Sequence, residues 1–172
     1  GYKIIIVLAG MHNNLRSQTQ VRLEESFLGY ETTANRDPGK PIGVAGFGDD
    51  LKTHSATTRA DNGDFNVTIA NHFAAISPEE RPWLFVVKKN KSVLKQLLKW
   101  LRNRVADATD SSDGHKIITN LPLLVIDDEA DNASVDTGEQ LFNDDGTPDE
   151  EHEPKAINSL IRQILHSFSK KA

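Results

Sequence analysis

Residues 121–131, LPLLVIDDEAD, join a short apolar run to a cluster of carboxylates. The apolar part, residues 123–126, follows Pro122 and ends abruptly at Asp127. A run of this length between such boundaries predicts a strand that is buried on both faces of a parallel sheet. Ligands of open α/β sheets bind just beyond the carboxyl ends of the strands. The carboxylates therefore stand where a binding site is expected.

The rest of the chain alternates between predicted strands and helices. The patterns predict strands at residues 2–9, 42–47, 66–70 and 82–87, and helices at 15–28, 91–107 and 154–172. Asn13 or Asn14 can cap the first helix, and Gly29 can close it. This order predicts an α/β three-layer sandwich with a mainly parallel sheet, in one domain over residues 1–172. We expect an irregular excursion at 30–65, a loop at 107–115 and an acidic loop at 132–153, mobile over at least 143–153.

Carboxylates at the end of a buried strand need compensation by a metal, by hydrogen-bond donors or by solvent. Magnesium suits the position, because it is held through one or two carboxylates while phosphate oxygens and waters complete its coordination. The alternative is an ordinary solvated turn, or the N-cap of a following helix. The position of the carboxylates alone leaves both the magnesium site and the solvated turn or N-cap open.

The order of residues 123–131 resembles the Walker B motif of superfamily two helicases, the DEAD box, carried here by Asp128, Glu129, Ala130 and Asp131. The resemblance implies that Asp128 contacts the magnesium of ATP, usually through water. It implies that Glu129 is the catalytic residue that positions or activates the attacking water. Asp128 and Asp131 are the cofactor-binding residues on this interpretation.

A wider resemblance rests on four segments: VLAG at 7–10, NNLRSQTQVRLEESFLG at 13–29, FVVKKNKSVLKQLLKWL at 85–101 and LLVIDDEADNASVDT at 123–137. Together they resemble the endonuclease Z-one domain family. That resemblance implies a RecA-like P-loop NTPase core and a role in restriction-modification systems. Residues 6–20 are also similar to helicase motif Ia, which touches the nucleic-acid backbone; Arg16, Gln18, Thr19 and Arg22 match its polar face. The alternative is a solvated helix face.

Charge is unevenly distributed along the chain, although the net charge is only −5. Residues 120–153 hold 12 acidic residues and no Lys or Arg, whereas residues 88–104 hold seven basic residues and no acid. An uncompensated basic helix face can bind the phosphate backbone through counterion release. We expect this of Lys89, Lys91, Lys95 and Lys99; plain solvent exposure is the alternative.

The sequence does not contain a complete set of ATPase motifs. Gly39-Lys40 is not a phosphate-binding loop, because that loop would need Gly at Ala34 and Ser or Thr at Pro41. We therefore expect a fragment, inactive alone, of an ATPase whose Walker A loop and second RecA-like domain lie outside residues 1–172. Its cofactors would be magnesium and ATP, and its partners DNA, the rest of the parent chain and other restriction-system proteins.

Two other functions remain open. The first is a metal-dependent endonuclease in which Asp127, Asp128, Glu129 and Asp131 hold the metal. The second is a non-catalytic interaction module. The absence of cysteine, of a secretory signal and of an apolar run near the roughly 20 residues of a membrane span fits a cytoplasmic protein without a membrane partner. His152, between glutamates, is expected to be solvated.

Overall fold

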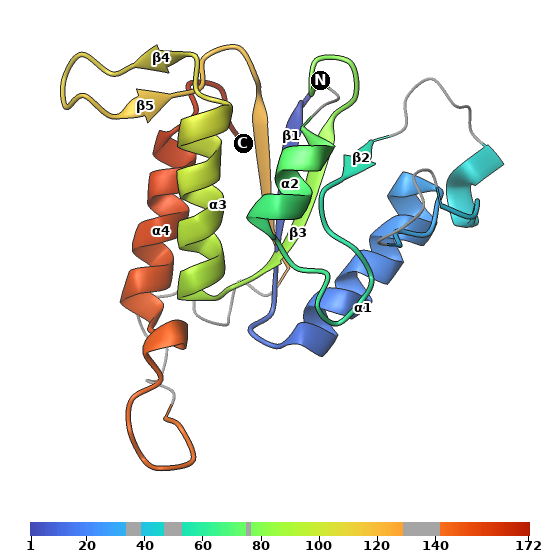
Figure 1. Cartoon of the computed structure of the whole chain (residues 1–172), viewed down its shortest axis with the longest axis horizontal. Coiled ribbons are helices and arrows are strands. Elements are labelled where there is room, and N and C mark those ends of the chain that lie inside the picture. The colour runs from blue at the N-terminus through green and yellow to red at the C-terminus, as the bar shows by residue number, and fades with distance from the viewer. Residues whose placement is uncertain (34–38, 47–52, 75–76, 129–141) are drawn as a thin grey trace.

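The computed structural model describes residues 1–33, 39–46, 53–74, 77–128 and 142–172 (Figure 1). Its main sheet is parallel, with strands in the order β2 (His54–Ser55), β3 (Trp83–Lys88), β1 (Ile4–Ala9) and β6 (Leu123–Asp127). The central strand β1 aligns Ile4 with Trp83 on one side and with Leu123 on the other. All six residues of β1 are buried, as its unbroken apolar sequence predicts.

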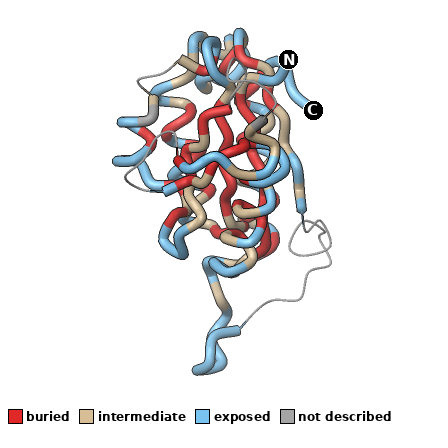
Figure 2. Tube along the Cα trace, turned by 90° about the vertical axis from the view of Figure 1, so that its right-hand side faces the viewer, coloured by how far each residue is buried: buried red, intermediate tan, exposed pale blue. Residues whose placement is uncertain are grey.

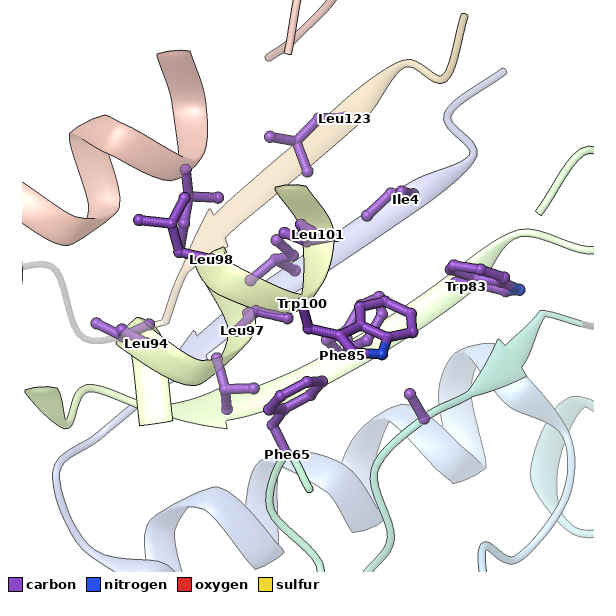
Figure 3. Packing of buried hydrophobic residues seen from close by; sticks show 14 of the residues in the cluster. Ile4, Phe65, Trp83, Phe85, Leu94, Leu97, Leu98, Trp100, Leu101 and Leu123 are labelled. Atoms are coloured by element: carbon purple, nitrogen blue, oxygen red, sulfur yellow. The ribbon is translucent and has the colours of Figure 1, made fainter. Parts of the chain in front are cut away.

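One face of the sheet is covered by α2 (Val67–Phe73), α3 (Lys91–Arg104) and α4 (Pro154–His166). Leucines of α3 recur at helical spacing and pack on the side chains of Ile4, Ile6 and Leu8. Figure 3 shows the aromatic part of this core, where Phe65, Trp83, Phe85 and Trp100 meet at ring-centroid distances of 5.7 to 6.4 Å. Such tilted and edge-on pairs add about 0.5–1.5 kcal/mol each beyond area burial.

The other face is covered by α1 (Asn13–Leu23) and by a turn of π-helix, η1 (Glu24–Leu28). Gly29 ends η1 with a φ of 77°, so the left-handed residue predicted here is confirmed. Figure 1 shows α1 on the opposite side of the sheet from α3 and α4, which makes three layers. The predicted α/β three-layer sandwich with a mainly parallel sheet is therefore correct.

Near β6, this second cover is incomplete. A groove of about 430 Å³ runs between η1 and the sheet, lined by residues that include Tyr2, Leu23, Phe27, Leu124 and Ile126. Ile126 is 43% exposed, whereas Leu123, which points to the other face, is 0% exposed. Figure 2 shows the buried residues concentrated in the interior of the molecule. β6 is thus buried well on one face only, although its sequence predicted burial on both.

Several local predictions were wrong. Residues 66–70 form the start of α2 rather than a strand, because Asn66 Oδ1 accepts hydrogen bonds from the amides of Thr68 and Ile69 and caps a helix. Residues 43–46 form a 3-10 helix, η2 (Gly43–Gly46), and Phe47 lies outside the described residues. The N-cap of α1 is His12, which makes no side-chain capping bond, instead of Asn13 or Asn14.

The predicted loop at 107–115 contains a short strand, β4 (Ala108–Thr109), which pairs antiparallel with β5 (Lys116–Ile117) directly after the loop. Within the predicted acidic loop, residues 142–152 form a turn followed by a 3-10 helix, η3 (Glu150–His152), while residues 132–141 are not described. The chain ends beside β6, where the carbonyl groups of Lys170 and Ala172 accept the amides of Leu123 and Val125. These bonds form an isolated parallel bridge between Leu123 and Lys171 at the sheet edge.

Candidate functional site

The carboxyl ends of β1, β3 and β6 meet at one edge of the sheet, called here the carboxyl edge. Parallel pairing brings Leu8 of β1 level with Asp127 of β6, and Ala9 level with Lys88 of β3. The loop before α1 and the start of α3 also lie at this edge, because each helix follows its strand directly. Basic residues after β3 and acidic residues after β6 are therefore brought together.

Asp127 is engaged by a buried cation. Its Oδ1 lies 2.5 Å from Nζ of Lys89, whose side chain is 0% exposed, while the Asp127 side chain is 24% exposed. A buried lysine requires such a partner, since an isolated ammonium is costly to remove from water. The pair links β3 to β6 across the end of the central strand. Lys89, predicted to bind DNA, is thus buried inside the protein, and that prediction is wrong.

Asp128 has a different environment. It is exposed, its backbone amide donates to the Leu8 carbonyl at 3.0 Å, and its Oδ2 accepts a hydrogen bond from the Thr19 hydroxyl at 3.0 Å. The main chain and Thr19 therefore hold an accessible carboxylate at the carboxyl edge. A hard oxygen donor of this kind fits magnesium, which needs few protein ligands when phosphate and water supply the others. Glu129, Ala130 and Asp131 lie outside the described residues, so their predicted roles stay predictions.

The engagement of Asp127 bears on the endonuclease alternative. That alternative needs several of the consecutive carboxylates to converge on the metal. Asp127 instead faces the buried ammonium of Lys89, and only Asp128 of the two is exposed. Consecutive residues of a strand point to opposite faces, which accounts for the division. The geometry favours a site with a single carboxylate from this pair.

Arg16 was predicted to contact DNA, and this prediction is also wrong. Its side chain is 0% exposed, and Nη2 donates to the carbonyls of Thr58 and Ala60 at 2.9 and 2.6 Å. Burial lowers the pKa of Arg16, while the nearby carboxylate of Asp64 opposes that shift. Arg16 therefore fastens the loop between β2 and α2 onto α1.

The other predicted nucleic-acid residues are accessible, but they form two separate groups. Gln18 and Arg22 are exposed on α1, one helical turn apart. Lys95 and Lys99 are exposed on α3, and Lys91 is half-buried in its first turn. Since α1 and α3 cover opposite faces of the sheet, the structure does not bring the two groups together (Figure 1).

Sequence reasoning missed the polar stripe that α1 and the start of η1 bury. Arg16, Thr19, Gln20 and Glu24 are all buried, and the Nε of Arg59 donates to Oε2 of Glu24 at 2.7 Å. Gln20 accepts the hydroxyl of Thr57 at 2.8 Å. The signal was present, because these positions recur at helical spacing. It was overlooked because burial was expected only for apolar residues.

Asp64 is bonded to the carboxyl edge at the end of β3. Its carboxylate accepts the amides of Phe65 at 2.7 Å and Lys88 at 3.3 Å. Burial raises the pKa of Asp64, and the amide of Phe65 and the charge of Arg16 oppose the shift. Lys88 Nζ in turn donates to Asn13 Oδ1 at 3.1 Å. The end of β3 is thereby tied to the start of α1.

Asp110, Asp113 and His115 form a second polar cluster, on the β4–β5 hairpin at the opposite end of the molecule. Their oxygen and nitrogen atoms lie within 4.8 Å of one another. Hydrogen bonds of the turn account for the closeness: Asp110 accepts from Ser112, and Asp113 pairs with His115. Those bonds lower the pKa values of both aspartates.

Comparison of the chain with protein-family models, with curated proteins and with solved structures gave no match. Each helix in the described part of the chain is too short or too polar to cross a membrane.

Proposed function

We propose that this chain is the Walker B part of a DNA-dependent ATPase, helicase-like or translocase-like, in a restriction-modification or defence system. The observation that carries the proposal is the division between Asp127 and Asp128 at the carboxyl edge. Asp127 is neutralised by Lys89, and Asp128 is presented to solvent by its main chain and Thr19. The sequence resemblance to the DEAD box assigns the metal role to this same residue, Asp128.

Asp128 would hold the magnesium of ATP through water, and Glu129, by its matching position, would accept a proton from the attacking water. Magnesium supplies neutralisation of the charge that develops on the phosphates. Asp131, by its matching position in the motif, would also bind the nucleotide. A phosphate-binding loop must complete the site, and residues 1–172 do not contain that motif. The isolated chain should therefore not turn over ATP.

The DNA surface in this proposal is the exposed face of α3. Lys91, Lys95 and Lys99 recur every fourth residue, and no acidic residue lies between residues 88 and 104. Such a stripe attracts the phosphate backbone without sequence preference. Gln18 and Arg22 of α1 would make a separate contact. Replacing Lys95 and Lys99 should weaken DNA binding and reduce its dependence on salt.

The testing experiment measures phosphate release by the longer parent protein, with and without DNA. Asp128→Asn and Glu129→Gln should each reduce DNA-stimulated release by about 10²- to 10⁴-fold, the usual contribution of a positioned base or of charge stabilisation. Glu80→Gln is the matched control, because Glu80 is an exposed carboxylate before β3, away from the carboxyl edge. Full turnover by the Asp128 variant would refute the proposal. Magnesium-dependent nicking of plasmid DNA would instead support the endonuclease.

A further inference from the structure

Residues 149–153, called here the acidic turn, dock onto the carboxyl edge at two points. Glu151 Oε2 accepts the backbone amide of Ser92 at 3.1 Å, in the first turn of α3. Nε2 of His152 lies 3.3 Å from the carbonyl oxygen of Met11, in the loop after β1. The acidic turn therefore spans the ends of two strands. His152 is partly buried there, so the expectation of a solvated histidine was wrong.

The contact around His152 is specific. Its Nδ1 lies 2.6 Å from Oδ2 of Asp149, and its ring centroid lies 6.5 Å from that of His12. Asp149 also accepts the amide of Glu151 at 3.0 Å, which fixes the short helix η3. Both nitrogen atoms of the His152 ring thus face oxygen acceptors. This arrangement orients Glu151 toward α3.

The docked position brings negative charge to the basic end of α3. Glu151 sits at the amide of Ser92, next to Lys91, and Lys95 follows one turn later. Glu150 is exposed beside it. Carboxylates are favoured at a helix N-terminus by the helix dipole, and they repel the phosphates of an approaching duplex.

We propose that the acidic turn is an autoinhibitory strap, which covers the N-terminal end of the α3 lysine stripe and must undock before a DNA backbone occupies it. The inference rests on the proposed function for its partner, DNA, and adds a regulation of that surface. Docked through Glu151 and His152, the strap keeps phosphate away from Lys91. Undocked, it leaves the stripe from Lys91 to Lys99 open to the backbone.

The test compares two variants of the chain that lose the same charge. Glu151→Gln weakens the docking contact, whereas Glu150→Gln removes an exposed neighbouring carboxylate. Affinity for a fluorescent 20-base-pair duplex is measured by anisotropy at two salt concentrations. Loss of one charge-assisted hydrogen bond predicts about a three- to tenfold tighter complex for Glu151→Gln than for Glu150→Gln. Circular dichroism verifies that both variants are folded.

A second readout follows the strap itself. A protease that cleaves after glutamate should cut at residues 150–153 faster when duplex is added to the wild-type chain, because DNA holds the strap undocked. Equal affinities of the two variants, or protection of the strap by DNA, would overturn the inference while DNA binding stood. Absence of DNA binding in every variant would overturn both this inference and the proposed DNA surface.

Discussion

At the scale of single residues, Asp127 forms an ion pair with the buried Lys89, whereas its sequence neighbour Asp128 faces solvent. Two adjacent carboxylates can therefore have unrelated roles. Lys89 is 0% exposed and Asp127 is partly exposed. Breaking a buried pair typically costs about 3–5 kcal/mol. Because water can reach Asp127, we expect Lys89→Met to lower the free energy of unfolding by about 2–3 kcal/mol, measured by urea denaturation.

The matched control is Lys95→Met, which removes an exposed lysine from α3. A surface substitution of this kind should change stability by no more than about 0.5 kcal/mol. For DNA affinity the order should be reversed: Lys95→Met should weaken DNA binding more than Lys89→Met, because Lys95 faces solvent and Lys89 does not. A Lys89 variant as stable as the control would contradict the buried pair.

At the scale of elements, the acidic turn makes a prediction about pH. The hydrogen bond from Ser92, the largest cause, lowers the pKa of Glu151, and the charge of Lys91 also contributes. A carboxyl group whose folded pKa is lowered stabilises the docked state fully above its unfolded value, about 4.3. That contribution is lost as the pH falls through the lowered pKa.

The measurement is an NMR titration of the Ser92 amide. Its chemical shift should follow Glu151 with a midpoint below about 4.3, and Glu151→Gln should abolish the transition. A midpoint at the ordinary glutamate value would show that the amide and the carboxylate are not bonded in solution.

Elements with a strong periodic pattern were predictable from sequence. The leucines of α3 and the unbroken apolar run of β1 allow only one arrangement each, and both were confirmed. Two-residue strands such as β2 were missed, because neither their length nor their composition distinguishes them from loop. Val67 and Ile69 favoured a strand, yet the side chain of Asn66 decides for a helix.

The candidate site was predictable only in part, because some of its features depend on contacts between residues distant in sequence. The position of Asp128 beyond a buried strand followed from the apolar run that precedes it. The burial of Lys89 and Arg16 could not be predicted, because it depends on partners that are distant in sequence. Lys89 pairs with Asp127, 38 residues away, and Arg16 bonds to Thr58, 42 residues away. A charge run indicates exposure only on average, and tertiary contacts decide the individual case.

At the scale of the whole molecule, the two faces of β6 are covered unequally. Leu123 packs beneath α3 and α4 at 0% exposure, whereas Ile126 borders the open groove at 43%. Leu123→Ala should therefore lower the free energy of unfolding by about 2–5 kcal/mol, and Ile126→Ala by about 1 kcal/mol or less. Thermal denaturation of the two variants measures the difference. Equal losses would mean that the groove is closed in solution.

The central place of β1 has a consequence for synthesis on the ribosome. Ile4 pairs with Trp83, which is made 79 residues later, and its second partner, Leu123, is made later still. At about 5–20 residues per second, the strand IIIVLA waits roughly 4–16 s before its first neighbour exists. During that delay the most apolar segment of the nascent chain is exposed to other polypeptides. We therefore expect chaperones to bind this segment until β3 emerges.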